Sequence, residues 1–289
     1  MKSDSYVGAL SVSDKSQRQG ADLQALLRPP SPWETIVTYV RCVLVVAEIE
    51  LRKLRHDPTE LLTRAVQPAL WLVIFGEAFS RLRAIPTGSV SYLTFMTPGI
   101  LAQSLMFVSI FYGLSIIWER DAGILQKFLV LPVPRASFVT GKGLGAAVRS
   151  LTQAVIIFVL ALLLGVHLQW SLVGLIGSLL AVLIAASFFS TLSMLIAILV
   201  KTRERFMGIG QVLTMPLFFA SNAIYPLAIM PDWLRILAQI NPLSYTVDLL
   251  RGFLVVGTVP DALLDWGVLL LAVIVAQALA ASTYQSIVL

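Results

Sequence analysis

The chain has few of the residues that catalytic and redox sites commonly use. It holds one cysteine and two histidines among 289 residues, and only 13% of its residues are charged. The single cysteine, Cys42, excludes an intramolecular disulfide, and His56 and His167 stand too far apart in the sequence to suggest a metal site. Soluble domains carry about 25% charged residues, so the composition excludes an ordinary soluble domain.

The chain is instead rich in long apolar runs. Hydrophobic residues make up 57% of the chain, and the mean hydropathy is +0.85. A helix needs about 20 residues to cross the hydrocarbon core. We therefore expect an all-α polytopic membrane protein with six transmembrane helices, over residues 65–82, 93–117, 144–166, 172–199, 207–226 and 263–285.

Positive charge sets the expected orientation, because lysine and arginine collect on the cytoplasmic side of membrane proteins. With six spans, 17 of the 21 basic residues fall on the side of the termini. The exceptions are Arg81, Arg83, Arg235 and Arg251. Both termini are therefore expected in the cytoplasm, and the net charge of +5 indicates orientation rather than nucleic-acid binding.

The N-terminal 57 residues divide into two expected parts, followed by a membrane domain over 58–289. Residues 1–32 are polar and lack the apolar core of a signal peptide, so we expect a flexible cytoplasmic tail. Residues 33–57 repeat apolar side chains about every 3.6 positions, with charges gathered towards the end. This pattern favours an amphipathic helix lying in the membrane interface. A seventh, buried helix is the alternative.

Prolines interrupt the apolar sequence before the last span. Pro226, Pro231 and Pro242 fall in a moderately apolar region near 226–256, which is too broken to form one span. Irregular backbone at membrane depth occurs only where protein or water satisfies its polar groups. We therefore expect a re-entrant helical region here, made of two short helices, and the alternative is a folded loop on the outer surface.

A charged segment near 118–130 follows the second apolar run. In a helix Glu119, Gly123 and Lys127 share one face, while Leu125 and Phe128 form an apolar ridge. Such a ridge suits a groove on a partner protein, and a coupling helix that touches a motor is our hypothesis. The alternative is a loop whose charges only anchor the ends of the spans.

The sequence predicts no enzymatic activity. The glycines around Lys142 lack the four-residue spacing and the following Ser or Thr of a nucleotide-binding loop. Neither a Gly-x-Ser-x-Gly elbow nor paired catalytic carboxylates are present. We expect no catalytic residue, bound cofactor or metal in this chain.

Polar and aromatic residues inside the expected spans have two interpretations each. Burying the carboxylate of Glu77 unpaired would cost about 2.5–3.5 kcal/mol, so it either contacts a translocation path or pairs with Arg81 as a structural contact. Span glutamines such as Gln67, Gln103 and Gln211 favour helix packing. An aromatic and methionine stripe either lines a conduit or faces lipid and core; its candidate pathway residues are Phe107, Phe111, Met215 and Phe218.

Two patches of the sequence resemble a known family. The first contains Thr97-Pro98-Gly99-Ile100, the charged segment and Gly141-Lys142; the second runs from Ile224-Tyr225-Pro226 to Arg251 and contains Ile240-Asn241-Pro242-Leu243-Ser244-Tyr245. In this order they resemble the membrane permeases of bacterial ABC-2 type exporters, to which daunorubicin-resistance and nodulation-factor exporters belong. The resemblance covers residues 92–254.

The resemblance implies a permease of the bacterial plasma membrane, driven by two separate ATP-binding cassette subunits that bind ATP and Mg. A second permease copy or paralogue would complete it. ATPase coupling is then expected at Glu119, Arg120, Asp121, Gly123, Leu125, Lys127 and Phe128, and an outer gate at Tyr225, Pro226, Asn241, Pro242 and Tyr245.

The expected cargo is an amphiphilic compound such as a drug, a polyketide or a lipid-linked saccharide. Few charged residues fall in the spans, which favours amphiphilic cargo over the polysaccharides that other permeases of this type export. A secondary carrier without a motor is a different alternative, but it needs ionisable residues near mid-membrane, which are scarce here. A scaffold that assembles an envelope complex without transport is a third.

Overall fold

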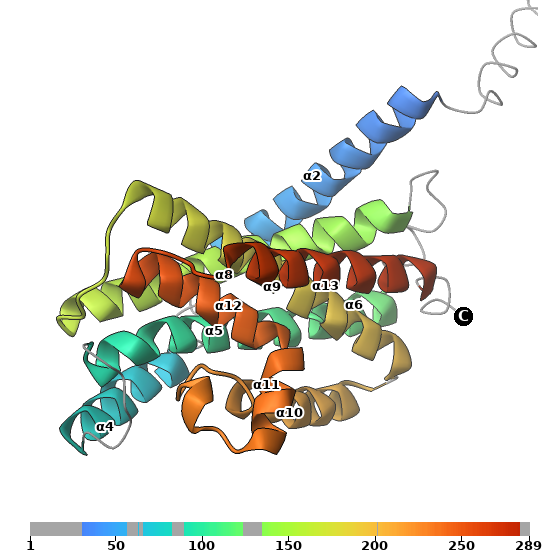
Figure 1. Cartoon of the computed structure of the whole chain (residues 1–289). Helices are drawn as coiled ribbons and strands as arrows, with labels where there is room; N and C mark the ends of the chain where they lie inside the picture. The colour runs from blue at the N-terminus through green and yellow to red at the C-terminus, as the bar shows by residue number, and fades with distance from the viewer. Residues whose placement is uncertain are drawn as a thin grey trace, which may run out of the picture.

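The computed structural model describes residues 31–56, 63, 66–82, 90–123, 135–200 and 202–283, and every element within these ranges is helical. Four helical segments are long and apolar enough to cross a membrane (Figure 1). They are Tyr92–Asp121, formed by α5 (Tyr92–Tyr112) and α6 (Leu114–Asp121), then Ala136–Leu163 in α8 (Arg135–Leu163), α9 (Leu172–Leu199) and α13 (Ala262–Thr283). Four of the six predicted spans thus have helices of sufficient length.

The other two predicted spans coincide with shorter helices. An apolar helix runs over Val66–Phe79 and includes the π-helix η1 (Trp71–Phe75) and the start of α4 (Gly76–Leu82). The fifth predicted span, 207–226, contains α10 (Arg203–Phe219), which has 17 residues and ends seven positions before the predicted boundary. Both are shorter than the usual spanning length of about 20 residues.

The helix predicted over 33–57 is α2 (Pro32–His56), which leaves the bundle obliquely and packs against α8 (Figure 1). Glycines on α8 permit this close approach. A Cβ on Gly141 would lie 2.7 Å from Val46 Cβ, and one on Gly145 would lie 2.7 Å from Glu50 Cγ. Small residues four positions apart commonly allow such contacts between helices in membranes.

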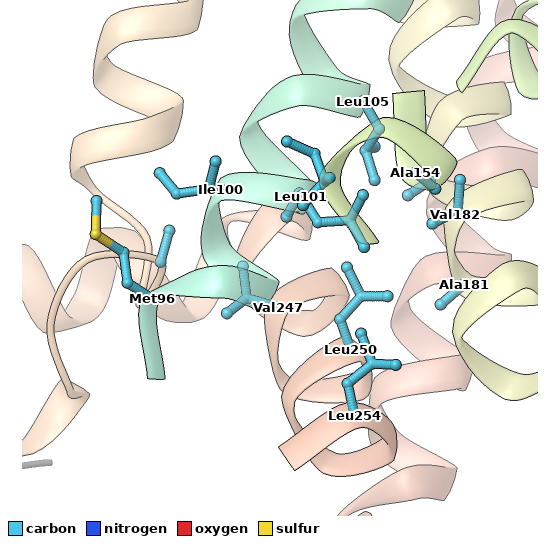
Figure 2. Close-up of a cluster of buried hydrophobic side chains, with 14 of the residues drawn as sticks. Met96, Ile100, Leu101, Leu105, Ala154, Ala181, Val182, Val247, Leu250 and Leu254 are labelled. Atoms are coloured by element: carbon cyan, nitrogen blue, oxygen red, sulfur yellow. The ribbon is translucent and has the colours of Figure 1, made fainter. Parts of the chain in front are cut away.

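The main hydrophobic core lies where α5, α8 and α9 meet α12 (Pro242–Arg251) and the π-helix η3 (Gly252–Val256). Figure 2 shows Leu101 and Leu105 of α5 facing Ala154 and Val182, while Leu250 and Leu254 enter from the other side. Alanines on α8 and α9 leave room for these leucines. The short helices α12 and η3 are therefore part of the core.

The proline-rich region forms several short helices, as its breaks predicted. Pro226 precedes the 3-10 helix η2 (Leu227–Ile229), Pro231 caps α11 (Asp232–Ile240), and Pro242 is the first residue of α12. Proline fits the first helical turn because the amide it lacks would have no partner there. Short helices at these breaks are confirmed, but with η3 they number four in residues 226–256, where two were expected. Their depth in a bilayer stays a prediction.

Candidate functional site

Five charged side chains from three helices meet at the end of α6. Lys142 Nζ of α8 lies 2.8 Å from Glu50 Oε1 of α2 and 2.6 Å from Glu119 Oε1 of α6. Lys53 Nζ lies 3.0 Å from each of the same two oxygens, and Arg149 Nη2 lies 3.7 Å from Glu50 Oε2. We call these five residues the ion cluster.

The ion cluster is largely withdrawn from solvent. The Lys142 side chain is 2% exposed, and those of Glu50 and Glu119 are 2% and 10% exposed. The Lys142 ammonium also lies 5.5 Å from the ring centre of Tyr112 and 5.8 Å from that of Phe138. Buried charges are tolerated when paired in this way, so the cluster fixes α2, α6 and α8 to one another.

Electrostatics keep the Glu50 carboxylate ionised. Burial acts to raise the pKa of Glu50, but the charges and hydrogen bonds of Lys142 and Lys53 outweigh it and hold the pKa at about 2. Burial likewise opposes the charge on Lys53, whereas Glu119 and Glu50 raise its pKa. Glu50 is therefore charged at neutral pH, and Lys142 and Lys53 together stabilise its negative charge.

Of the predicted coupling residues, four lie within the described ranges. Glu119 belongs to the ion cluster, and Arg120 Nε lies 3.8 Å from Asp121 Oδ1. Asp121 Oδ2 accepts a hydrogen bond of 3.2 Å from Arg203 of α10. Gly123 has a left-handed φ of 68°, a conformation that ends helices and favours glycine. Leu125, Lys127 and Phe128 lie outside the described residues.

Sequence reasoning did not pair four members of the ion cluster: Glu50, Lys53, Lys142 and Arg149. Glu50 and Lys142 are 92 positions apart, so no local spacing could reveal their contact. A usable signal was still present. Lys142 and Arg149 are isolated cations on the apolar helix α8, and such charges require partners.

A cavity of about 440 Å³ opens between α5, α10 and the residues Thr63, Gln67 and Pro68. Its lining combines amide and apolar side chains: Gln67, Gln103, Gln211, Phe107, Phe111 and Met207. The Phe107 and Phe111 rings stack with centres 5.9 Å apart. The buried Gln103 Oε1 accepts no hydrogen bond within the described part of the chain. Glutamines expected to pack helices thus line a space with both polar and apolar walls.

The structure separates the four predicted pathway residues. Phe107 and Phe111 line the cavity, whereas Phe218 is 1% exposed and belongs to the main core, with its ring centre 5.7 Å from that of Trp71. Met215 lies on the surface of α10, where it is 37% exposed. The side chain of Glu77 is exposed, and its expected partner Arg81 has no described side chain.

The predicted gate residues surround the C-terminal end of α10. Asn241 Nδ2 donates to the carbonyls of Leu217 at 2.6 Å and Ala220 at 3.0 Å, and Tyr225 Oη donates to the Phe219 carbonyl at 2.6 Å. Helix C-termini leave carbonyls without hydrogen-bond donors, and these side chains supply the missing donors. Asn241 Oδ1 also accepts from Leu243 N and so caps α12.

The remaining gate residues extend the same arrangement. Tyr245 Oη donates to the Gln239 carbonyl at 2.5 Å, which ties α12 back to α11. Pro226 and Pro242 start the short helices on either side. Asp248 and Arg251, three positions apart on α12, form an ion pair, with Oδ1 and Nη1 3.7 Å apart.

Comparisons with known proteins identify a matching family and several relatives of this chain. The family described as ABC-2 type transporter matches residues 41–255. A protein of Cyanophora paradoxa provisionally named transport permease ycf38 is 31% identical over 231 residues, which cover 79% of each chain. The daunorubicin resistance ABC transporter permease protein DrrB1 of Streptomyces coeruleorubidus is 25% identical over 68% of this chain and 69% of its own. Nodulation protein J of Rhizobium leguminosarum bv. trifolii is 24% identical over 74% of this chain and 81% of its own.

Proposed function

Because the chain belongs to the ABC-2 type transporter family, we propose that it is the membrane subunit of an exporter driven by separate ATPase subunits. Two ATPase copies, with their own ATP and Mg, would act on a pair of permeases formed with a second copy or a paralogue. The ion cluster is the observation that carries this proposal. It joins Glu119, where α6 enters the charged segment, to α8 and α2, so force on that segment reaches all three helices.

We place this permease in a bacterial plasma membrane with six spans and both termini in the cytoplasm. The two short apolar helices would complete the four long ones, and the helices of 226–256 would enter the outer leaflet. The exposed apolar face of α2 supports an interfacial position for that helix. Its members are Trp33, Ile36, Val40 and Leu44, each at least 48% exposed.

The ATPase contact is tested by co-purification. We expect the chain, co-expressed with the ATPase encoded beside it and purified through its own tag, to carry two ATPase copies. Replacing Leu125 and Phe128 together by alanine removes the predicted apolar ridge and should reduce ATPase recovery by about tenfold or more. Leu263→Ala, at a site 92% exposed on α13, is the matched control. Full recovery with the double variant would contradict the coupling hypothesis.

The cavity supports an amphiphilic cargo. Aromatic rings and Met207 offer apolar contact, while the three glutamines offer amide donors and acceptors. We therefore place the cargo between α5 and α10, and we name drugs, polyketides and lipid-linked saccharides as its candidate classes. A polysaccharide would fit this lining less well, because much of the cavity wall is apolar.

Variants of the cavity test the cargo. In lipid vesicles containing the complex, Phe107→Ala and Gln211→Ala should raise the concentration of an amphiphilic drug needed to stimulate ATP hydrolysis by about tenfold. Val212→Ala, one residue further along α10 and 72% exposed, should leave this concentration unchanged. Equal responses in all three variants would remove the cavity from the path.

The contacts at the end of α10 support an outer gate. Asn241→Ala leaves the carbonyls of Leu217 and Ala220 without their donor, and each unsatisfied buried carbonyl costs about 1–3 kcal/mol. We expect this variant to lose most of its transport activity and still to bind the ATPase subunits. Gln239→Ala is the control, since its side chain is exposed and its backbone contact with Tyr245 is retained. Normal transport by Asn241→Ala would argue against a gate here.

A further inference from the structure

A second cavity, of about 320 Å³, lies between the end of α12 and the start of α13. Asp248, Asp261 and Asp265 line it together with Arg251. It sits at the opposite end of α13 from the ion cluster, because Gln277, near the other end of the helix, lies 3.4 Å from Thr140 beside Lys142. The cavity is therefore separate from the ion cluster, and it shares no lining residue with the cavity between α5 and α10.

Asp265 is the unusual residue of this cavity. It is 4% exposed and belongs to a helix apolar enough to cross a membrane. Its carboxylate forms no hydrogen bond or ion pair with any residue in the described ranges, and only its backbone amide is engaged, with Asp261 O. A buried carboxylate without a partner is costly, so its presence in a cavity points to a ligand.

Arg251 does not neutralise Asp265. Its Nη1 lies 3.7 Å from Asp248 Oδ1, its Nη2 donates to the Asn222 carbonyl at 2.8 Å, and its guanidinium lies 3.9 Å from the ring centre of Phe95. Asn222 Nδ2 also donates to Asp248 Oδ1 at 2.6 Å. Asp248 and Arg251 thus pair with each other, which leaves Asp265 and the exposed Asp261 to attract a cation.

The rest of the lining indicates which kind of cation fits. Leu227, Val256 and Val259 supply apolar wall beside the carboxylates. A hard metal ion takes six or more oxygen ligands, and no group of three or more acidic, His or Cys side chains in the described residues is placed to hold one. An ammonium group needs only hydrogen-bond acceptors and negative charge, and its carbon skeleton needs apolar contact.

We propose that this cavity binds a small organic ammonium ion, with Asp265 as its direct counter-ion. Asp261, which is exposed at the rim of the cavity, adds electrostatic attraction for the cation as it enters. The volume lies at the lower end of the range for ligand sites, about 300–1,000 Å³, which suits a phenylalkyl amine or a molecule of that size. The proposal concerns binding alone and stands or falls without any ATPase.

Calorimetry on the purified chain in lipid nanodiscs tests the site, with 2-phenylethylammonium as the probe. We expect saturable binding that Asp265→Asn weakens by about tenfold or more. Asp232→Asn removes the same charge from α11, where the side chain is 95% exposed, and should bind like the unaltered chain. The neutral 2-phenylethanol, which has the same skeleton, should not bind.

Thermal unfolding of the same samples provides an independent readout. Asp265→Asn should unfold at an equal or higher temperature without the probe, because it replaces a buried carboxyl group that has no partner among the described residues. The probe should stabilise only the chain that keeps Asp265. Four results would overturn the proposal: no saturable binding, equal binding of the alcohol, unchanged affinity in Asp265→Asn, or displacement of the probe by Mg²⁺ or Ca²⁺ at comparable concentration.

Discussion

Lys142→Met is expected to destabilise the folded chain by about 3–5 kcal/mol, the cost of removing one partner from a buried ion pair. Methionine fills a similar volume but carries no charge. Among the described residues, the carboxylates of Glu50 and Glu119 would then share Lys53, which is 46% exposed, and Glu50 would keep the more distant Arg149. Thermal unfolding in nanodiscs measures the loss.

Two control variants separate charge from packing. Lys53→Met removes a cation that contacts the same oxygens but is half exposed, so its effect should be much smaller, of about 1 kcal/mol. Glu50→Gln combined with Lys142→Met removes both members of one pair and should recover part of the stability. A Lys142→Met variant as stable as the unaltered chain would show that the cluster does not hold the helices together.

Acidification provides a further test of the same prediction. In the unaltered chain the folded pKa of Glu50, about 2, lies below its ordinary value of 4.5. Its contribution to stability is therefore present above about pH 4.5 and is lost as the pH falls towards 2. Lys142 is the largest of the causes that lower this pKa. Lys142→Met should therefore lose less stability than the unaltered chain when the pH falls from about 4.5 to 2.

Several features of the fold were predictable because their causes are local. The helices at 93–117, 172–199 and 263–285 follow from long, mainly apolar runs, and the breaks at Pro226, Pro231 and Pro242 follow from proline geometry. The i, i+3 pairing of Asp248 with Arg251 is also a local property of a helix. In each case neighbouring residues suffice to determine the structure.

Other features depend on contacts between distant residues and could not be predicted. The end of α10 at Phe219 is one, because Asn241 supplies its capping donor from more than 20 positions later. Membership of the ion cluster is another, because Glu50 meets Lys142 only after α2 packs on the glycines of α8. Packing also divides the aromatic stripe, because it places Phe218 in the core and Phe107 in a cavity.

Gly99→Ala is expected to cost about 3 kcal/mol, at the upper end of the range for overfilling a packed site. Gly99 is in α5, where the added Cβ would overlap the Ala223 carbonyl oxygen and would lie 2.8 Å from its carbon. Backbone atoms cannot rotate away as a side chain can. The segment after α10 would have to move away from α5. The hydrogen bond of 3.2 Å from Tyr92 Oη to the Ile224 carbonyl would then be lost.

Gly208→Ala is the matched substitution, and its expected effect has the opposite sign. Gly208 lies within α10, and a Cβ there meets nothing within 4 Å. Alanine favours a helix interior over glycine by about 1 kcal/mol, so this variant should unfold at a higher temperature. Opposite shifts would show that Gly99 is needed for close packing of α5 on the chain after α10. Equal shifts would mean that this contact can loosen without a loss of stability. The proposed outer gate would then have to be held in place by other contacts.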